Sequence, residues 1–265
     1  MKGKGLIAGN WKMNKGIGES MDFLGRFVDG LEREGSVSEL IPASIEIVIF
    51  PPIANLYAIK HAASLKKGVY LGVQNVHWKA SGAFTGENSV SMAVEAGAVF
   101  ALIGHSERRQ IFLETDEMTS KKFNFCVKNG LKPVLCVGET DEDRKNGLAE
   151  AVITRQVIAV LGSREFPADF PPLIIAYEPV WAIGTENNAT ANDAQESCAA
   201  IRKVVGRSID AKTAGNTLLL YGGSVKSSNA EDYLKQDDID GLLVGGASLD
   251  PDEFLGIIRA ASFLI

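Results

Sequence analysis

Short apolar segments recur along the chain, each time with enough residues between them for a helix. The segments run through consecutive Val, Ile and Leu residues and lack the alternation of polar and apolar positions that a strand with one wet face shows. Such runs are typical of parallel strands that are buried on both faces. We therefore expect eight parallel strands, over residues 5–11, 45–50, 69–74, 99–104, 132–138, 173–178, 217–223 and 240–246.

The segments between the expected strands have the spacing of amphipathic helices. In the first of them, apolar residues recur at steps of three and four and predict one buried helix face. These residues are Met21, Leu24, Phe27, Val28 and Leu31. The last helix has a start signal, because Asp250 can cap it, Pro251 suits its first position and Glu253 its third.

Eight strand-and-helix units fit one closed (β/α)₈ barrel, and a chain of 265 residues suits such a barrel as a single domain over residues 1–265. A doubly wound open sheet is the structural rival, because it is built from the same units. Glycines and polar residues favour the barrel. They follow several different strands, and a barrel brings all its strand ends to one face.

Composition narrows the function classes. Hydrophobic residues make up 46% and charged residues 23% of the chain, as in an ordinary globular protein with a large core. The formal net charge is -6 and Lys and Arg form no cluster, which argues against nucleic acid but leaves a small anion possible. No apolar run approaches the roughly 18 residues of a membrane span and no signal-like segment opens the chain, so we expect no membrane contact and a cytoplasmic location.

Three cysteines, Cys126, Cys136 and Cys198, lie far apart and form no C-x-x-C pair. This spacing suits neither a disulfide framework nor a zinc site, so we expect reduced thiols in the core. No cluster of His, Cys and acidic residues has the spacing of metal ligands. We expect neither a metal nor an organic cofactor, because acid and base groups alone can move a proton next to a carbonyl.

Charged side chains lie at or just beyond the ends of three of the expected strands. Glu178 comes after an apolar run and before Pro179, where burial should raise its pKa and make it a general base. His105 follows the fourth strand and could equally be a structural residue. Lys12 follows the first strand and could simply extend its amine to water. Glu178 is the hardest of the three to explain by structure alone.

Two glycine clusters follow the last two strands, YGGSV at residues 221–225 and LLVGGASL at 242–249. Glycine lets the backbone approach a ligand closely, so that backbone N–H groups can bind an anion such as phosphate. The loops after strands seven and eight are also the frequent phosphate site of (β/α)₈ barrel enzymes. The clusters therefore predict a phosphate-binding end of the barrel.

The chain carries, in this order, the motifs AGNWKMN, QNVHWKASGAFTGE, IGHSERR, PVLCVGE, AYEPVWAIGT, YGGSV and LLVGGASL. Together they span nearly all of it and resemble the triosephosphate isomerase family, and so many motifs in register are very specific. The resemblance implies interconversion of dihydroxyacetone phosphate and D-glyceraldehyde 3-phosphate through an enediolate, a step of glycolysis and gluconeogenesis.

The resemblance also implies roles for single residues. Glu178 matches the catalytic base, and His105 matches the electrophile that donates to the carbonyl oxygen. Lys12 matches the cation that offsets developing negative charge, with Asn10 beside it as an oxyanion donor. Substrate and phosphate would be bound by Asn10, Lys12, Gly184, Ser224, Gly245 and Gly246.

Residues 179–185 match the start of a mobile lid that would seal the site from water. Tyr221 matches the residue that latches the closed lid. The chain departs from the family where it reads ENNATAN, at residues 186–192, because the family commonly has Gly-Lys-Thr-Ala-Thr-Pro there. Trp181, Ile183 and Gly184 match lid residues, whereas Asn187 and Asn188 replace the Lys and Thr of the hinge that follows the lid. The departure therefore concerns the rate of lid motion and not the chemistry.

The family pattern also implies supporting residues and a partner. Glu107 and Arg108 match residues that orient the cation and the lid, although they could also form a surface ion pair. Asn75 and Thr85 match a protruding loop that enters the neighbouring subunit, and Glu87 belongs to the same interface. The resemblance therefore implies a homodimer.

Two alternatives to this isomerase come from other function classes. The first is a non-catalytic phosphate-binding barrel that acts as a sensor or scaffold, which loss of Glu178, His105 or Lys12 would favour, and all three are present. The second is another sugar-phosphate enzyme such as an aldolase. An aldolase needs a Schiff-base lysine on a strand, and the strand ends offer only Lys12. The segment 30–44 has no function assigned to it.

Overall fold

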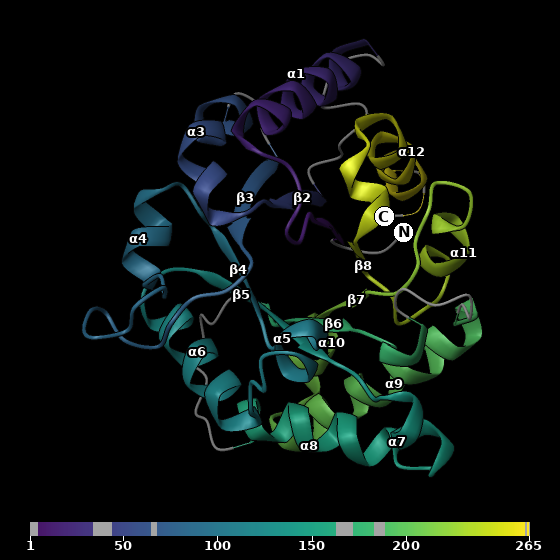
Figure 1. Ribbon diagram of the computed structural model, residues 1–265. Helices are drawn as coiled ribbons and strands as arrows, with labels where there is room; N and C mark the ends of the chain where they lie inside the picture. Colours follow the sequence, from purple (N-terminus) through teal and green to yellow (C-terminus); the bar gives the residue numbers. More distant parts are fainter. Residues whose placement is uncertain are drawn as a thin grey trace.

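The computed structural model describes residues 5–33, 44–64, 68–162, 172–182, 189–262 and 264. The eight strands within these residues form one closed barrel in chain order, and helices surround it as an outer ring (Figure 1). The first strand closes the barrel because it pairs in parallel with both the second and the eighth. The expected (β/α)₈ barrel is confirmed, and the open doubly wound sheet is excluded.

All eight expected strands are present, although several are shorter than their apolar runs. Their bounds are β1 (Gly5–Asn10), β2 (Ile45–Phe50), β3 (Val69–Val73), β4 (Phe100–Ile103), β5 (Lys132–Val137), β6 (Ile174–Tyr177), β7 (Leu218–Tyr221) and β8 (Gly241–Val244). The last two strands stop before the glycines that follow them, because those glycines leave the barrel wall and enter loops.

Helices connect the strands throughout the described residues. They are α1 (Ile17–Arg33), α3 (Ile53–Ser64), α4 (Val90–Glu95), α5 (Ser106–Gln110), α6 (Asp116–Lys128), α7 (Asp141–Lys145), α8 (Ala149–Leu161), α9 (Ala191–Ser208), α10 (Ala211–Asn216), α11 (Ala230–Leu234) and α12 (Pro251–Ser262). Two short 3₁₀ helices, η1 (Val180–Ala182) and η2 (Gly246–Leu249), follow β6 and β8. Both lie at the carboxyl end of the barrel.

Residues along a strand alternate between two buried surroundings. In β1, Leu6 and Ala8 pack inside the barrel with residues such as Phe50 and Phe100, whereas Ile7 packs in the layer between the strands and the helices. Both faces of the strand are therefore apolar, which explains the continuous apolar runs. Side chains fill the barrel interior, so a ligand binds at an end of the barrel and not inside it.

The buried face of α1 differs from the expected one. Phe23, Leu24 and Phe27 are buried, but Met21 is 43% exposed. The ring of Phe23 packs edge-on against Trp11, with ring centroids 4.8 Å apart. The apolar face is rotated toward Phe23 because the indole offers a core partner that the spacing of apolar residues did not reveal.

The expected start of α12 is confirmed. Oδ1 of Asp250 accepts the backbone N–H groups of Asp252 and Glu253, each at 2.9 Å. Pro251 is the first residue of the helix, where its missing N–H costs nothing. This cap begins the helix two residues after η2.

Candidate active site

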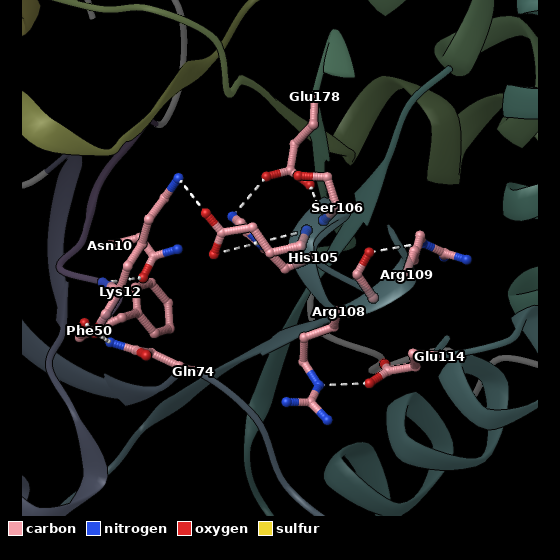
Figure 2. Close-up of polar contacts among 12 residues, drawn as sticks. Asn10, Lys12, Phe50, Gln74, His105, Ser106, Arg108, Arg109, Glu114 and Glu178 are labelled. Carbon is pink, nitrogen blue, oxygen red and sulfur yellow. Dashed lines mark hydrogen bonds and ion pairs between the residues drawn. The ribbon is translucent and has the colours of Figure 1, made fainter. Parts of the chain in front are cut away.

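The polar side chains expected at the strand ends converge on one end of the barrel (Figure 2). Asn10 is the last residue of β1, His105 lies two residues beyond β4, and Glu178 follows β6 directly. All three side chains are buried. Beside them opens a cavity of about 880 Å³ whose lining includes Lys12, Ser106, Ser224, Gly245 and Gly246.

The carboxylate of Glu178 is held by two neighbouring groups. Its Oε1 lies 2.9 Å from Nε2 of His105, and its Oε2 accepts the backbone N–H of Ser106 at 2.7 Å (Figure 2). Burial raises the pKa of Glu178, but the contacts with His105 and Ser106 outweigh burial and the pKa is lowered. The expected upward shift is wrong for this arrangement, because both neighbours stabilise the charged form.

The backbone of Glu178 is fixed from behind. Its N–H donates to the carbonyl of Val137 at 2.7 Å. Gly138 lies so close that a Cβ there would come within 1.8 Å of the carbonyl oxygen of Glu178. Gln156 holds Gly138 in turn, because its amide accepts the N–H of Gly138 at 2.8 Å and donates to its carbonyl at 3.1 Å. The carboxylate can therefore change position through its side chain alone.

The hydrogen bonds of His105 assign its tautomer. Nδ1 accepts the backbone N–H of Glu107 at 3.2 Å, so the proton of the neutral ring is on Nε2, which faces Glu178. Burial lowers the pKa of His105, but the negative charge of Glu178 leads the opposing effects that raise it overall. The upward shift of this pKa thus depends on the carboxylate that lies against the ring.

Lys12 has an unusual backbone conformation. Its φ is +52°, in the left-handed region that residues other than glycine rarely adopt and that costs about 1–2 kcal/mol. Its N–H donates to Oδ1 of Asn10 at 3.0 Å, and its carbonyl accepts from Nε2 of Gln74 at 2.7 Å. The amine pairs with Oε1 of Glu107 at 2.7 Å. Together these contacts hold the amine at the edge of the cavity.

The glycine clusters of the last two strands line the same cavity. A Cβ at Gly245 would lie 3.8 Å from Cε of Lys12, so this backbone faces the lysine side chain. Gly223 cannot carry a side chain, because a Cβ there would come within 2.1 Å of Oη of Tyr221. The site therefore combines an amine with glycine backbone, an arrangement suited to an anion.

Comparison with known proteins agrees with this geometry. Residues 5–261 match the family model described as Triosephosphate isomerase. The chain belongs to the triosephosphate isomerase family.

Curated relatives in the triosephosphate isomerase family cover almost the whole chain. The triosephosphate isomerase of Symbiobacterium thermophilum is 46% identical over 257 residues, which are 97% of this chain and 96% of the relative. The one from Acidithiobacillus ferrooxidans has the same identity and the same coverage. The one from Aquifex aeolicus is 44% identical over 253 residues, 96% of this chain and 98% of the relative.

Two residues that the triosephosphate isomerase pattern assigns to the lid region are described. Nε1 of Trp181 donates to Oε1 of Glu139 at 2.8 Å. Tyr221 is buried and stacks on Tyr233 with ring centroids 4.1 Å apart, and its Oη has no hydrogen-bond partner within the part of the chain that the structure describes. Outside the described residues lie Ile183, Gly184, Asn187 and Asn188.

Glu107 and Arg108 contact different partners. Glu107 contacts the amine of Lys12, as the triosephosphate isomerase pattern implies. Arg108 turns the other way, and its Nε pairs with Oε2 of Glu114 at 2.7 Å (Figure 2). Arg108 therefore joins the ion pair of Glu114 with Lys122, and it also lines a cavity together with Lys12.

The loop between β3 and α4, which the resemblance assigns to subunit contact, projects beyond the ring of helices (Figure 1). Thr85 and Glu87 in this loop are exposed. Asn75 at its base instead accepts a hydrogen bond from Nζ of Lys122 at 2.7 Å. The ring of His77 packs at a tilt against the ring of Phe84, with ring centroids 4.1 Å apart, which ties the far part of the loop to its base.

Sequence reasoning missed Glu139 and Gln74, two polar residues near strand ends. Glu139 lies two residues beyond β5 and is fully buried. Its Oε1 accepts from Oη of Tyr177 at 3.0 Å and pairs with Nη1 of Arg144 at 3.4 Å. Gln74 follows β3 directly. The rule that singled out Glu178, a polar residue just after an apolar strand, would have found both.

The structure also describes the cysteines, the clusters of acidic, His and Cys side chains, and the helix lengths. Cys126, Cys136 and Cys198 are buried free thiols, as expected. Within the described ranges, no group of three or more His, Cys, Asp or Glu side chains is arranged to hold a metal ion. The helices in those ranges include none that is both long and apolar enough to cross a membrane.

Proposed function

We propose that this chain is an aldose-ketose isomerase that interconverts dihydroxyacetone phosphate and D-glyceraldehyde 3-phosphate through an enediolate. The observation that carries the proposal is the contact between Glu178 and His105, a base and a proton donor buried beside a cavity with a lysine and glycine-rich walls. Membership of a family whose curated relatives are named triosephosphate isomerase supports it. This reaction belongs to glycolysis and gluconeogenesis.

Glu178 is the proposed base, which takes a proton from the carbon next to the substrate carbonyl and returns it to the neighbouring carbon. Its lowered pKa keeps it charged at neutral pH, as a base requires. To reach a substrate carbon the carboxylate must leave His105 and Ser106, which are the groups that lower its pKa. Burial then dominates and raises the pKa, so the carboxylate becomes a stronger base at the point of reaction.

The same movement prepares His105 to act as the electrophile. Once Glu178 turns away, Nε2–H can donate to the substrate carbonyl oxygen that becomes the enediolate oxygen. Without the carboxylate, burial lowers the pKa of His105 and keeps the ring neutral. Triosephosphate isomerases are themselves the standard example of a glutamate base that works with a neutral histidine.

Lys12 and Asn10 are the proposed groups that stabilise developing negative charge. The amine of Lys12 supplies positive charge at the edge of the cavity, and Glu107 orients it. Oδ1 of Asn10 is occupied by the N–H of Lys12, which leaves Nδ2 as its donor for an oxyanion. Both residues act without moving, because β1 and the contacts of Lys12 hold them.

The substrate phosphate is proposed to bind the glycine-rich loops after β7 and β8. Ser224, Gly245 and Gly246 line the cavity, and position after the last two strands is typical of phosphate sites in barrel enzymes. The family pattern adds Gly184, and closure of a lid over residues 179–185 would exclude water and protect the enediolate.

The non-catalytic sensor or scaffold gains no support from the site. A phosphate sensor needs the glycine loops and Lys12, but it has no use for a buried carboxylate in contact with a histidine. Burying Glu178 away from water costs free energy, which a reaction explains and phosphate binding alone does not.

A coupled assay tests the proposal, with purified protein converting D-glyceraldehyde 3-phosphate into dihydroxyacetone phosphate. Glu178→Gln keeps the size and one hydrogen-bond acceptor but removes the base, and should lower turnover by about 10²- to 10⁴-fold. Glu231→Gln, which removes a carboxylate at an exposed position of α11, is the matched control and should retain activity. Correctly folded wild type that binds phosphate without turnover would instead favour the sensor.

A homodimer is part of the same proposal. Met13, Phe112 and Leu113 are 95%, 63% and 76% exposed, which is unusual for a cluster of large apolar side chains. Met13 and Phe112 line a second cavity of about 350 Å³ together with Glu87, Asn10 and Lys12, and Leu113 follows Phe112 in the chain. A partner loop in this cavity would cover apolar surface and approach the catalytic groups at once.

The backbone of Leu113 supports the dimer independently. Its φ is +56°, a left-handed conformation that costs a residue with a Cβ about 1–2 kcal/mol. Its side chain is largely exposed, so an isolated chain recovers little of this cost. A partner that buries the side chain would offset it.

We also propose that residues 1–265 form a single catalytic domain and that the protein acts in the cytoplasm. Closure of the barrel by β1 and β8 supports one domain, because the two ends of the chain belong to the same sheet. Buried free thiols support a reducing compartment.

A further inference from the structure

The loop that follows β7 is braced by the last helix of the chain. The backbone N–H of Ser227 donates to Oε1 of Glu253 in α12 at 2.7 Å. The two segments approach closely because residue 256 is glycine, and a Cβ on Gly256 would lie 2.8 Å from Cβ of Ser227. Helix α12 therefore supports the loop through one hydrogen bond and one close packing contact.

A second set of bonds holds the part of the loop nearest the cavity. Nδ2 of Asn229 donates to the carbonyl of Ser224 at 3.2 Å, and its Oδ1 accepts the backbone N–H of Lys226 at 2.8 Å. Ser224 is thus tied to Asn229, while Ser227 between them is tied to Glu253. The position of Ser224 depends on both ties, because only two residues separate it from Ser227.

Glu253 also contributes charge to the site. It lines the 880 Å³ cavity together with Ser224, Gly245 and Gly246. A carboxylate in a cavity that takes an anion opposes binding, although the amino end of α12 offsets part of its charge. An amide oxygen could accept the N–H of Ser227 equally well. The hydrogen bond with Ser227 therefore does not by itself require the negative charge of Glu253.

We propose that Glu253 is a positioning residue that orients the phosphate-binding loop and whose negative charge limits how tightly the loop holds phosphate. The inference rests on the proposed function, because it takes the substrate's phosphate as the anion in this cavity. Substrate and product carry the same phosphate, so a limit on its affinity favours product release as well as weakening substrate binding.

Three variants separate geometry from charge. Glu253→Gln keeps an acceptor for Ser227 and removes the charge, while Glu253→Ala removes both. Asp252→Asn is the matched charge control, because Asp252 is the neighbouring carboxylate on the same helical turn. Its side chain is exposed and pairs with Arg26 at 2.8 Å instead of facing the loop.

Phosphate affinity is measured by calorimetry with inorganic phosphate and turnover by the coupled assay, on full-length protein whose fold is checked by circular dichroism. Glu253→Gln should bind phosphate about two- to fivefold more tightly and lower KM by a similar factor, with kcat unchanged or reduced. Glu253→Ala should bind about two- to tenfold more weakly than Glu253→Gln. Asp252→Asn should match wild type.

Each contrary outcome has a distinct meaning. If Glu253→Gln and Asp252→Asn change the phosphate affinity equally, the effect is one of net charge alone. If Glu253→Gln and Glu253→Ala bind phosphate equally tightly, Glu253 has no positioning role. Either result overturns the inference while wild-type turnover still upholds the proposed function. Wild type that binds phosphate without turnover counts against the isomerase alone, since the order of phosphate affinities is read independently by calorimetry.

Discussion

Nε2 of His105 lies 2.9 Å from Oε1 of Glu178, and each group shifts the pKa of the other toward its charged form. The proposed base and the proposed electrophile are therefore in contact with each other before a substrate binds. This arrangement compensates for burial of the carboxylate. It also means that one side-chain movement activates both groups.

The contact between these two residues predicts a pH-dependent contribution to stability. The raised pKa of His105 stabilises the fold below its ordinary value of 6.5, and this contribution is lost as pH rises through the folded-state pKa. The lowered pKa of Glu178 stabilises the fold above its ordinary value of 4.5, and this contribution is lost as pH falls through the folded-state pKa. Both contributions to the free energy of unfolding are therefore fully present between about pH 4.5 and about pH 6.5.

Urea unfolding of wild type and His105→Gln measures this contribution. The difference in free energy of unfolding between the two should be largest near about pH 5.5 and should fall as pH rises through the folded-state pKa of His105, because the ring then loses the charge that pairs with Glu178. A difference that stays constant from acidic to alkaline pH would contradict the pairing of charges at this site.

Shortening the proposed base should affect catalysis far more than stability. Glu178→Asp withdraws the carboxylate by one methylene from the reacting carbon, and a displacement of that size costs about 10²-fold in turnover. The backbone around it is held by Val137 and Gly138, so the melting temperature should change little. Steady-state kinetics and thermal unfolding test this, and near-normal turnover would remove Glu178 as the base.

A buried ion pair beneath the active-site loops should contribute strongly to stability. Nζ of Lys122 lies 2.6 Å from Oε2 of Glu114, and both side chains are buried. Burial raises the pKa of Glu114, but Lys122 and Arg108 outweigh it and lower the pKa. Burial also lowers the pKa of Lys122, and there it prevails over the attraction of Glu114. The charge of Glu114 therefore depends on its pairing with Lys122 and Arg108.

Glu114→Ala leaves a buried amine with one partner fewer and should cost about 3–5 kcal/mol in the free energy of unfolding. Glu117→Ala in α6, the helix that carries Lys122, is the matched control, because Glu117 pairs with Lys121 at 2.6 Å on the exposed side and its loss should have little effect. The loss for Glu114→Ala should shrink as pH falls below about 4.5, because protonation removes the charge in wild type too. Denaturant titrations at two pH values measure both, and equal losses for the two variants would refute the prediction.

The proposed dimer predicts that one exposed loop residue controls assembly and activity together. Thr85→Arg adds a long charged side chain to the projecting loop and should split the dimer, with activity falling in step. Asn146→Arg makes the same change at an exposed position beyond α7 and should leave both unchanged. Sedimentation velocity and the coupled assay read the two properties, and an active Thr85→Arg monomer would separate catalysis from assembly.

Much of the fold and the outline of the site follow from local pattern. Strands buried on both faces must be apolar at every position, so β1 and β6 are visible in the sequence as continuous runs. Parallel strands in a barrel end on one face, so a polar residue after an apolar run, such as Glu178, is visible as a site residue. These inferences need no knowledge of the contacts between residues that are distant in the sequence.

Properties that depend on distant contacts were not predictable in this way. The pKa of Glu178 is set by His105 and Ser106, and the backbone donor lies 72 positions away in the chain. The pairing of Arg108 with Glu114 was not visible either, because it forms part of a cluster that Lys122 of another element completes. Spacing along a helix also failed to choose Phe23 over Met21, because the choice depends on Trp11 from another element.

The pairing of β1 with β8 has a consequence for protein synthesis. Lys12 leaves the ribosome long before Gly245, whose backbone faces its side chain. A nascent chain that stops before β8 leaves β1 with an open edge and the cavity without one wall. We therefore expect such truncated translation products to be inactive and prone to pair with other chains, so that catalytic competence arises only when the final strand has been made.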